Sequence, residues 1–255
     1  MRGLKDKIAI VTGGGGGIGR AICRRLAEEG CGVAIFDIDK ASAEESAALV
    51  RERGAAAHAA TVDITDRDAV ERAVAAVGDG FGAVDILVNN AGWDRVGTFL
   101  ETTPELWQKI VAINLWGPLY MHHAVLARMA TRGRGRVVTI ASDAGRVGSS
   151  GEAVYSFCKG GIIAFSKTLA RELAAKRINI NVVCPGPTET PLLQSFIGEG
   201  EAGQKIYEGL KRAIPFRRLG QPDDIPGIVA FLASDDAAFI TGQVISVSGG
   251  LTMHG

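Results

Sequence analysis

Tyr155 and Lys159 lie four residues apart, and their spacing suits proton-transfer chemistry. On a helix, residues four apart share one face, one turn from each other. A free tyrosine phenol titrates near pH ~10, and a neighbouring ammonium group lowers that pKa by stabilising the phenolate. Such a tyrosine can accept a proton from an alcohol or donate one to a carbonyl. Ser142, which follows an apolar run at 137–140, is placed to hydrogen-bond to the same oxygen. Because Tyr-x-x-x-Lys also occurs by chance on solvated helices, the prediction depends on the rest of the chain.

The N-terminal region predicts a dinucleotide-binding unit. A buried strand at 7–12 is followed by five glycines, Gly13 to Gly17, and then by a helix to about Glu29. Glycines let the backbone approach a pyrophosphate, and the helix N-terminus supplies N–H donors. The run matches G-x-G-x-x-G at 14, 16 and 19, but five glycines match almost any such pattern. The informative feature is therefore their position between a strand and a helix.

Acidic residues end or follow the next two predicted strands, at 32–37 and 56–62. Asp37 is placed to accept hydrogen bonds from a ribose 2′-hydroxyl, and its charge would repel a 2′-phosphate. No Lys or Arg lies inside the glycine turn, so the sequence favours NAD over NADP. The alternative is that Asp37 only caps the following helix. Asp63 is equally compatible with an adenine contact and with a simple approach to a helix.

The remaining chain alternates strands with helices. Further strands are predicted at 84–88, 137–140, 178–183 and 243–247, and further helices at 41–53, 66–79, 104–130, 222–233 and from Tyr155 to about Lys176. This alternation predicts an α/β fold with one doubly wound parallel sheet in a single domain, 1–255. Residues 191–213 are weakly periodic, and we expect a substrate lid there with one or two short helices.

Composition excludes several functional classes. Among 255 residues, 28 Lys and Arg balance 28 Asp and Glu, so no basic field exists to attract nucleic acid or a membrane surface. The four cysteines lack metal-ligand spacing and are expected to be reduced and buried. The adjacent His122 and His123 accompany no metal set, and a core or interface role is expected for them. No signal peptide and no apolar run near ~18 residues is evident, so we expect a soluble, cytoplasmic protein.

Several short motifs together resemble the classical short-chain dehydrogenase/reductase family: Thr12-Gly13-x-x-x-Gly17-Ile18-Gly19, Asn89-Asn90-Ala91-Gly92, Asn114, Ser142, Tyr155-x-x-x-Lys159 and Pro185-Gly186. The resemblance implies a Rossmann-type sheet of seven parallel strands and a homotetramer. It implies Tyr155 as acid/base, Lys159 as its pKa tuner and a ribose ligand, Ser142 as holder of the substrate oxygen, and Asn114 in a water-mediated proton relay. The cofactor contacts that it implies are Gly13, Gly16, Gly17, Ile18, Asp37, Asp63, Ile64, Asn90, Tyr155, Lys159, Pro187, Thr188 and Thr190.

A narrower likeness concerns the substrate. Gly92-Trp93-Asp94 and the segments 121–126, 142–152 and 248–253 are similar to enzymes that oxidise 2-hydroxycyclohexanecarboxyl-CoA in aromatic acid degradation. This implies NAD-dependent oxidation of a secondary alcohol in a β-hydroxyacyl-CoA. Arg146 and the basic residues of 205–218 are compatible with CoA phosphates or with plain surface charge, and Trp93 with Leu192–Leu193 is compatible with a ring slot or ordinary core.

Other functions remain compatible with these residues. Within the family, they are a 3-oxoacyl-acyl-carrier-protein reductase and a 3-hydroxybutyrate dehydrogenase. A non-catalytic nucleotide-binding scaffold is disfavoured because Ser142, Tyr155 and Lys159 are all present.

Overall fold

A computed structural model describes residues 1–198 and 200–253. The predicted domain 1–255 and the predicted lid 191–213 each include positions outside this description. The seven strands form one sheet of order β3-β2-β1-β4-β5-β6-β7, and every pairing is parallel. In chain order the strands are β1 (Ile8–Thr12), β2 (Gly32–Asp37), β3 (Ala57–Thr61), β4 (Val84–Asn89), β5 (Gly135–Ile140), β6 (Ile178–Pro185) and β7 (Val244–Val247).

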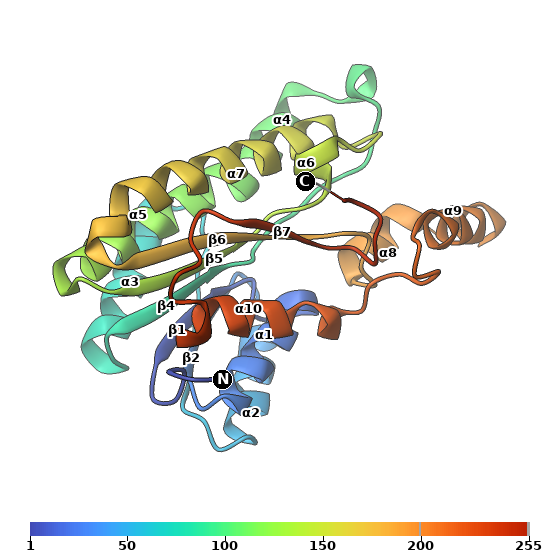
Figure 1. Ribbon diagram of the computed structural model, residues 1–255. Coiled ribbons are helices and arrows are strands. Elements are labelled where there is room, and N and C mark those ends of the chain that lie inside the picture. The colour runs from blue at the N-terminus through green and yellow to red at the C-terminus, as the bar shows by residue number, and fades with distance from the viewer. Residues whose placement is uncertain (199, 254–255) are drawn as a thin grey trace.

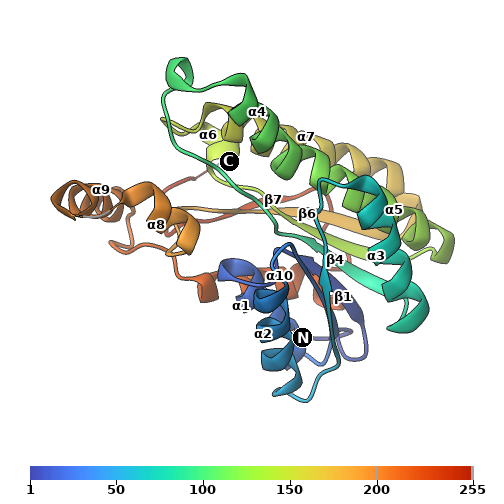
Figure 2. The same cartoon turned by 180° about the vertical axis from the view of Figure 1, so that it is seen from behind.

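Helices cover both faces of this sheet, as the doubly wound prediction requires. They are α1 (Gly17–Glu28), α2 (Lys40–Arg51), α3 (Arg67–Gly80), α4 (Pro104–Val111), α5 (Gly117–Arg132), α6 (Ala144–Val147), α7 (Ala153–Leu173), α8 (Pro191–Ile197), α9 (Gly200–Ala213) and α10 (Pro226–Ala233). Helices α3, α4, α5 and α7 lie over one face, and α1, α2 and α10 lie over the other (Figures 1 and 2). Helices α8 and α9 project from the edge at which the strands end (Figure 1).

Local sequence explains where several helices begin. Asp39 and Asp66 cap α2 and α3 by accepting hydrogen bonds from the backbone N–H groups of Ser42 and Ala69, at 2.7 and 3.0 Å. Such caps each stabilise a helix by about 1 kcal/mol. Thr190 caps α8 in the same way, and proline occupies its first turn, where a missing N–H costs nothing. The strands leading into these caps are apolar, so each strand ends where polar capping residues begin.

One helical stretch differs from the expectation that no segment could span a membrane. Among the described residues, Pro104–Arg132 is long and apolar enough for this by length and composition alone. Half of its most apolar part is buried, however, and Met121, Val125 and Met129 are fully enclosed in the core between α3, α5 and the sheet. The apolar residues of this stretch therefore form one layer of the domain core.

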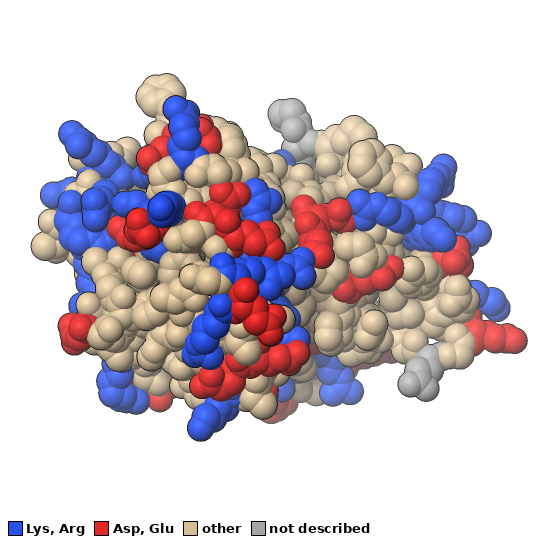
Figure 3. Space-filling model, turned by 90° about the horizontal axis from the view of Figure 1, so that it is seen from below, with Lys and Arg blue, Asp and Glu red and all other residues tan. Residues whose placement is uncertain are grey.

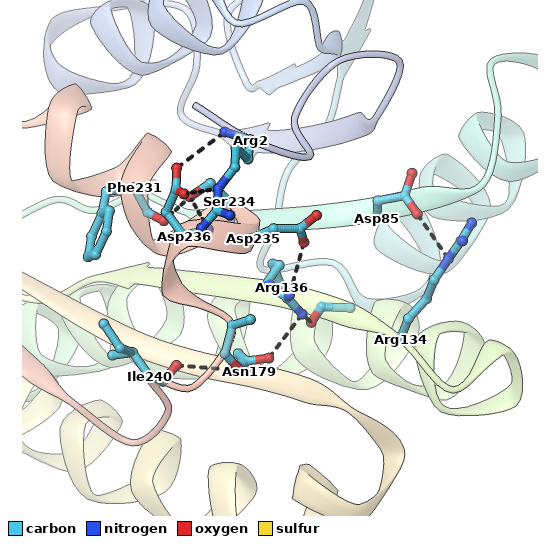
Figure 4. A network of polar contacts seen from close by, with 12 residues as sticks. Arg2, Asp85, Arg134, Arg136, Asn179, Phe231, Ser234, Asp235, Asp236 and Ile240 are labelled. Atoms are coloured by element: carbon cyan, nitrogen blue, oxygen red, sulfur yellow. Dashed lines mark hydrogen bonds and ion pairs between the residues drawn. The ribbon is translucent and has the colours of Figure 1, made fainter.

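A polar network lies at the N-terminal ends of the strands, opposite their carboxyl ends. Arg136 of β5 donates a hydrogen bond to Asn179 of β6 at 2.9 Å and approaches Asp235 at 3.4 Å. Asn179 in turn donates to the carbonyl of Ile240 at 2.9 Å (Figure 4). This network ties the segment 235–240 to the starts of β5 and β6, away from the carboxyl ends of the strands.

Candidate active site

The glycine turn after β1 allows no side chain at two positions. Gly13 has φ +61°, in the left-handed region that favours glycine. A Cβ on Gly19 would lie 2.0 Å from the carbonyl oxygen of Gly13. Asn90 locks the turn by donating from Nδ2 to the carbonyls of Thr12 and Gly13, at 3.1 and 3.0 Å. The N-terminus of α1 has no side-chain cap, so its N–H donors are free to hold an anionic group.

Asp37 lies at the end of β2 and lines the same cavity as the glycine turn. Its Oδ2 accepts from the Gly15 N–H at 2.8 Å, and its Oδ1 accepts from the Asp39 N–H at 3.0 Å. Asp39, rather than Asp37, makes the side-chain cap of α2. The alternative that Asp37 serves only as a helix cap is therefore not what the structure shows. Asp37 instead holds its charge beside the turn.

The nearest cation to this turn is already neutralised. Arg20 donates to the carbonyl of Gly15 and forms a bidentate ion pair with Glu45. Both of its hydrogen bonds to the Glu45 carboxylate measure 2.7 Å. Asp63 lines the cavity and also makes a local turn, because its Oδ1 accepts from the N–H and hydroxyl of Thr65 at 2.8 and 2.7 Å. Both interpretations of Asp63 are thus compatible with its position.

Ser142, Tyr155 and Lys159 converge where β5 meets α7. Lys159 is 3% exposed, and its Nζ donates to the carbonyl of Ile140, the last residue of β5, at 3.1 Å. That Nζ lies 5.4 Å from the centre of the Tyr155 ring. Ser142 lines the same cavity as the Tyr155 phenol and lowers the pKa of that phenol. The helical spacing of Tyr155 and Lys159 therefore places both on the face of α7 that meets the end of β5.

The charges around Tyr155 differ from the sequence-based expectation. Burial raises the pKa of the Tyr155 phenol, and the carboxyl groups of Glu152 and Asp94 raise it further, whereas Ser142 opposes them. Burial also lowers the pKa of Lys159 to about 8. Lys159 is not among the groups that shift the Tyr155 pKa here, so this geometry does not show the acidifying effect expected of its ammonium.

A close helix crossing holds Ser142 against this pair. A Cβ on Gly145 of α6 would lie 2.6 Å from the carbonyl carbon of Lys159 and 2.8 Å from the amide nitrogen of Gly160. Gly160 would in turn carry its Cβ 3.2 Å from the carbonyl oxygen of Gly145. The two backbones therefore touch directly. This contact explains why α7 carries glycine at position 160, and Gly145 was not among the residues predicted for the site.

Asn114 lies behind the cavity, within a π-helical turn, Ala112–Trp116, that joins α4 to α5. It is fully buried, and its Nδ2 donates to the carbonyls of Trp93 and Ile110 at 2.6 and 2.9 Å. The Asn114 amide is therefore both buried and hydrogen-bonded where the two helices join. Such π-turns occur frequently at functional sites, because they disturb the regular backbone hydrogen bonding.

The segment after β6 closes over the glycine turn. A Cβ on Gly17 would lie 3.5 Å from the Cγ2 of Thr190, so this segment meets the start of α1. Helices α8 and α9 then add an apolar wall that includes Leu193, Phe196 and Leu210. The expected one or two short helices in 191–213 are present as α8 and α9.

The glycine turn, Asp37, the Ser142–Tyr155–Lys159 cluster and the wall of α8 and α9 border one cavity of about 1290 Å³. Every predicted cofactor residue lines it: Gly13, Gly16, Gly17, Ile18, Asp37, Asp63, Ile64, Asn90, Tyr155, Lys159, Pro187, Thr188 and Thr190. Ser142 lines it as well, and of the four predicted catalytic residues only Asn114 is set back from it. A glycine cradle at one end and an acid–base pair at the other fit a dinucleotide with a substrate beside it.

The structure also shows where the cysteines, the two adjacent histidines and Arg146 lie. All four cysteines are free and buried, as expected. His122 is buried, whereas His123 is exposed and lies 3.6 Å from Glu71. Arg146 is unsuited to CoA phosphates, because its Nη1 donates to Ser246 at 2.9 Å and to the carbonyl of Val244 at 3.3 Å.

Comparison with known proteins decides the family. A family model described as enoyl-(acyl carrier protein) reductase matches residues 13–252. The chain is 39% identical over 251 residues to the 3-oxoacyl-acyl-carrier-protein reductase FabG of Escherichia coli (strain K12), covering 98% of this chain and 99% of that protein. The chain belongs to the short-chain dehydrogenase/reductase family.

Other relatives of this short-chain dehydrogenase/reductase are named for substrates that differ from one another and from that of FabG. It is 37% identical over 254 residues to the (2S)-[(R)-hydroxy(phenyl)methyl]succinyl-CoA dehydrogenase subunit BbsD of Thauera aromatica, covering 98% of each chain. A solved NAD⁺-bound xylitol dehydrogenase matches with TM-score 0.89 and 33% identity, covering 98% of this chain and 100% of that one. An actinorhodin polyketide ketoreductase with NADPH matches with TM-score 0.92 and 36% identity over 100% of both chains. Membership in this family makes the protein an oxidoreductase that acts on CH–OH groups with a nicotinamide cofactor.

Proposed function

We propose that this enzyme uses NAD to oxidise a secondary alcohol that lies β to a CoA thioester, with 2-hydroxycyclohexanecarboxyl-CoA or another β-hydroxyacyl-CoA as substrate. The observation that carries the proposal is the convergence of Ser142, Tyr155 and Lys159 on a cavity whose far end holds the Asp37 carboxylate. We further assign this activity to a soluble, cytoplasmic protein.

The proton chemistry falls to Tyr155. In oxidation, the substrate hydroxyl proton passes to the Tyr155 oxygen, while Ser142 holds the substrate oxygen. A bound nicotinamide would supply the hydride acceptor for the carbinol carbon. Since burial raises the Tyr155 pKa, the phenol is protonated at neutral pH, and that form serves carbonyl reduction. Alcohol oxidation should therefore become faster as pH rises.

Lys159 and Asn114 support this step from behind. The Lys159 ammonium is held by the Ile140 carbonyl and is positioned to meet a ribose hydroxyl and to stabilise negative charge that develops on Tyr155. Asn114 fixes the Trp93 loop against the helical turn that precedes α5. We propose that this turn also positions the water of a proton relay.

NAD is favoured by the charges around the glycine turn. Asp37 would accept hydrogen bonds from a free ribose 2′-hydroxyl and would repel a 2′-phosphate. Arg20, the nearest cation, is already paired with Glu45 and so offers little compensation. Pro187, Thr188 and Thr190 line the cavity on the segment that closes over the glycine turn, and there we place the nicotinamide.

An acyl-CoA fits the outer part of the cavity. Trp93 and the apolar side chains of α8 and α9 surround the space next to Tyr155, which suits a ring or alkyl chain. Lys205, Lys211 and Arg212 belong to α9, and Lys and Arg side chains gather at that end of the molecule (Figure 3). We propose that α8 and α9 act as a lid and that these basic groups receive the phosphates, in place of Arg146.

The deciding experiment follows NADH formation from NAD⁺ with 2-hydroxycyclohexanecarboxyl-CoA, its free acid and 3-hydroxybutyryl-CoA in parallel. Turnover of a CoA ester with little turnover of the free acid supports the proposal. Activity confined to reduction of 3-oxoacyl thioesters with NADPH would instead support a 3-oxoacyl-acyl-carrier-protein reductase, the second candidate, which the likeness to FabG favours. Preferential oxidation of free 3-hydroxybutyrate would indicate a 3-hydroxybutyrate dehydrogenase, and cofactor binding without turnover would indicate a scaffold.

We also propose a homotetramer. The outer faces of α7 and of the turn before α5 expose Phe157 (63%) and Trp116 (49%). Phe239 near the start of β7 is fully exposed, and Met253 is 79% exposed. Exposed apolar groups of this size indicate contact surfaces, and light scattering on the purified protein measures the oligomer mass.

A further inference from the structure

Two carboxyl groups beside Tyr155 have no part in the chemistry described above. Asp94 follows β4 and is 3% exposed, and Glu152 precedes α7 and lines the cavity. Neither carboxylate oxygen of Asp94 accepts a hydrogen bond of normal geometry from any residue in the described part of the chain. Burying a carboxylate without hydrogen-bond donors costs folding free energy. Such a group beside a reacting side chain therefore points to a functional role.

The fold brings the two loops that carry these groups into contact. The loop that carries Asp94 docks on the loop that carries Glu152 through a hydrogen bond from the Gly97 N–H to the Gly151 carbonyl, at 2.9 Å. A Cβ on Gly151 would lie 2.8 Å from a methyl group of Val96, so the loops are in direct contact. This loop contact brings Glu152 near Asp94, and the Glu152 carboxyl raises the pKa of the Asp94 carboxyl. Two carboxyl groups so close can share a proton but resist carrying two negative charges.

The groups around this pair do not cancel the mutual effect of its two carboxyls on their pKa values. Burial and Glu152 raise the pKa of Asp94 to about 6, opposed by the backbone N–H of Arg95 and the ammonium of Lys159. The pair acts on Tyr155 too, since both carboxyls raise its pKa. Lys109 of α4 lies 3.9 Å from the centre of the ring of Trp93, the residue before Asp94, so its charge is directed onto that ring. The thiol of Cys158 also feels Asp94, but burial keeps it neutral.

We propose that Asp94 and Glu152 form a proton-sharing carboxyl pair that determines specificity by rejecting substrates with a free carboxylate next to the reacting carbon and admitting neutral esters and thioesters. In a β-oxo acid the carboxylate carbon is separated from the reacting carbon by a single methylene, so it cannot avoid the surroundings of Tyr155. A thioester places an uncharged carbonyl there instead. This inference deepens the proposed function and rests on it for the choice of β-oxo and β-hydroxyacyl compounds.

The test uses a matched pair of small substrates that differ only in charge. Ethyl 3-oxobutanoate and 3-oxobutanoate are reduced with NADH by the wild type, Asp94→Asn, Glu152→Gln and the double variant. We expect the double variant to lower the ester-to-acid ratio of kcat/KM by about tenfold, mostly through a lower KM for the acid, because removing a like charge favours the anion. Glu172→Gln, an exposed carboxyl at the far end of α7, is the matched control and should leave the ratio unchanged.

The pH dependence separates charge from shape. As pH falls through about 6, the wild-type pair gains a proton, and its ester-to-acid ratio should fall, whereas 3-oxobutanoate stays ionised. The double variant should show a flat ratio over the same range. A wild-type ratio that is equally flat, or a ratio that the substitutions leave unchanged, overturns the inference.

A second measurement reads the pair without turnover. Carboxyl titration by ¹³C NMR should show a wild-type step near pH 6 that is lost in Asp94→Asn. Titration of both carboxyls at ordinary values would overturn the shared proton. If the wild type reduces neither small substrate nor any thioester, the proposed function fails. The titration still tests the carboxyl pair in that case, so the two failures are distinguishable.

Discussion

Replacing Gly145 by alanine tests whether the α6–α7 crossing positions the catalytic groups. The new Cβ would fall 2.6 Å from the Lys159 carbonyl carbon and 2.8 Å from the Gly160 nitrogen, which are backbone atoms that no side-chain rotation can move. Helix α6 must therefore shift away from α7 and carry Ser142 with it. Overpacking of this kind costs about 1–3 kcal/mol, or a fall in Tm of roughly 2–12 °C for a domain of this size.

The loss of activity should exceed what the loss of stability explains. A displacement near 1 Å between Ser142 and Tyr155 is expected to lower kcat by up to about 10²-fold. NAD affinity should fall less than kcat, because the close contacts of Gly145 are with the backbone of α7 and not with the glycine turn. Steady-state kinetics and isothermal calorimetry with NAD⁺, both well below Tm, measure the two effects separately.

Gly78→Ala is the control for this substitution. Gly78 lies inside α3, where a Cβ would meet only a terminal nitrogen of Arg128, at 3.6 Å. Alanine there should raise stability by up to about 1 kcal/mol and leave kcat unchanged. Gly145→Ala with wild-type Tm and kcat would refute the reasoning that backbone contact at this crossing holds the site together.

Three further predictions concern single side chains. Tyr155→Phe should reduce turnover to background in a dehydrogenase assay while NAD affinity, measured by calorimetry, stays close to wild type; retained turnover would remove Tyr155 from proton transfer. Asp37→Ala should narrow the NAD-to-NADP preference in kcat/KM, and an unchanged ratio would count against the ribose contact. Asp94→Asn should stabilise the protein near neutral pH by about 1–2 kcal/mol, after discounting about 1.4 kcal/mol per pKa unit for solvent screening. Because the raised Asp94 pKa makes the native state bind more protons than the unfolded state between 3.8 and about 6, the wild type loses stability as pH rises through that window. Urea unfolding at several pH values measures the difference, which should vanish below 3.8, and a pH-independent difference would contradict it.

Much of the site could be predicted because its parts lie at the ends of parallel strands. Asp37, Asn90 and Ser142 each end or follow a strand, and the strands meet at one edge, so sequence order alone brings them together. The helical spacing of Tyr155 and Lys159 needed no tertiary information either. Sequence reasoning failed where contacts are non-local, as for Arg146, whose partners on β7 come almost a hundred residues later.

The lid and its surroundings show the same division. The composition of 191–213 indicated short helices, and α8 and α9 are present. Their apolar side chains face the cavity only because β6 delivers the chain to the edge where the strands end. The segment 142–151 contains α6, which was not predicted, and α6 lies in direct backbone contact with α7.

By itself, the sequence determined which residue types were available and their order: a glycine turn after a strand, an acid after the next strand, and a tyrosine and lysine on one helical face. These features are local, and backbone geometry fixes them wherever the segment folds. Only the tertiary structure decided the balance of charge at the site, because a pKa depends on burial and on neighbours from other segments. The desolvation of Tyr155 and the meeting of Asp94 with Glu152 both arise when β4, β5 and α7 pack together, and no spacing along the chain encodes them.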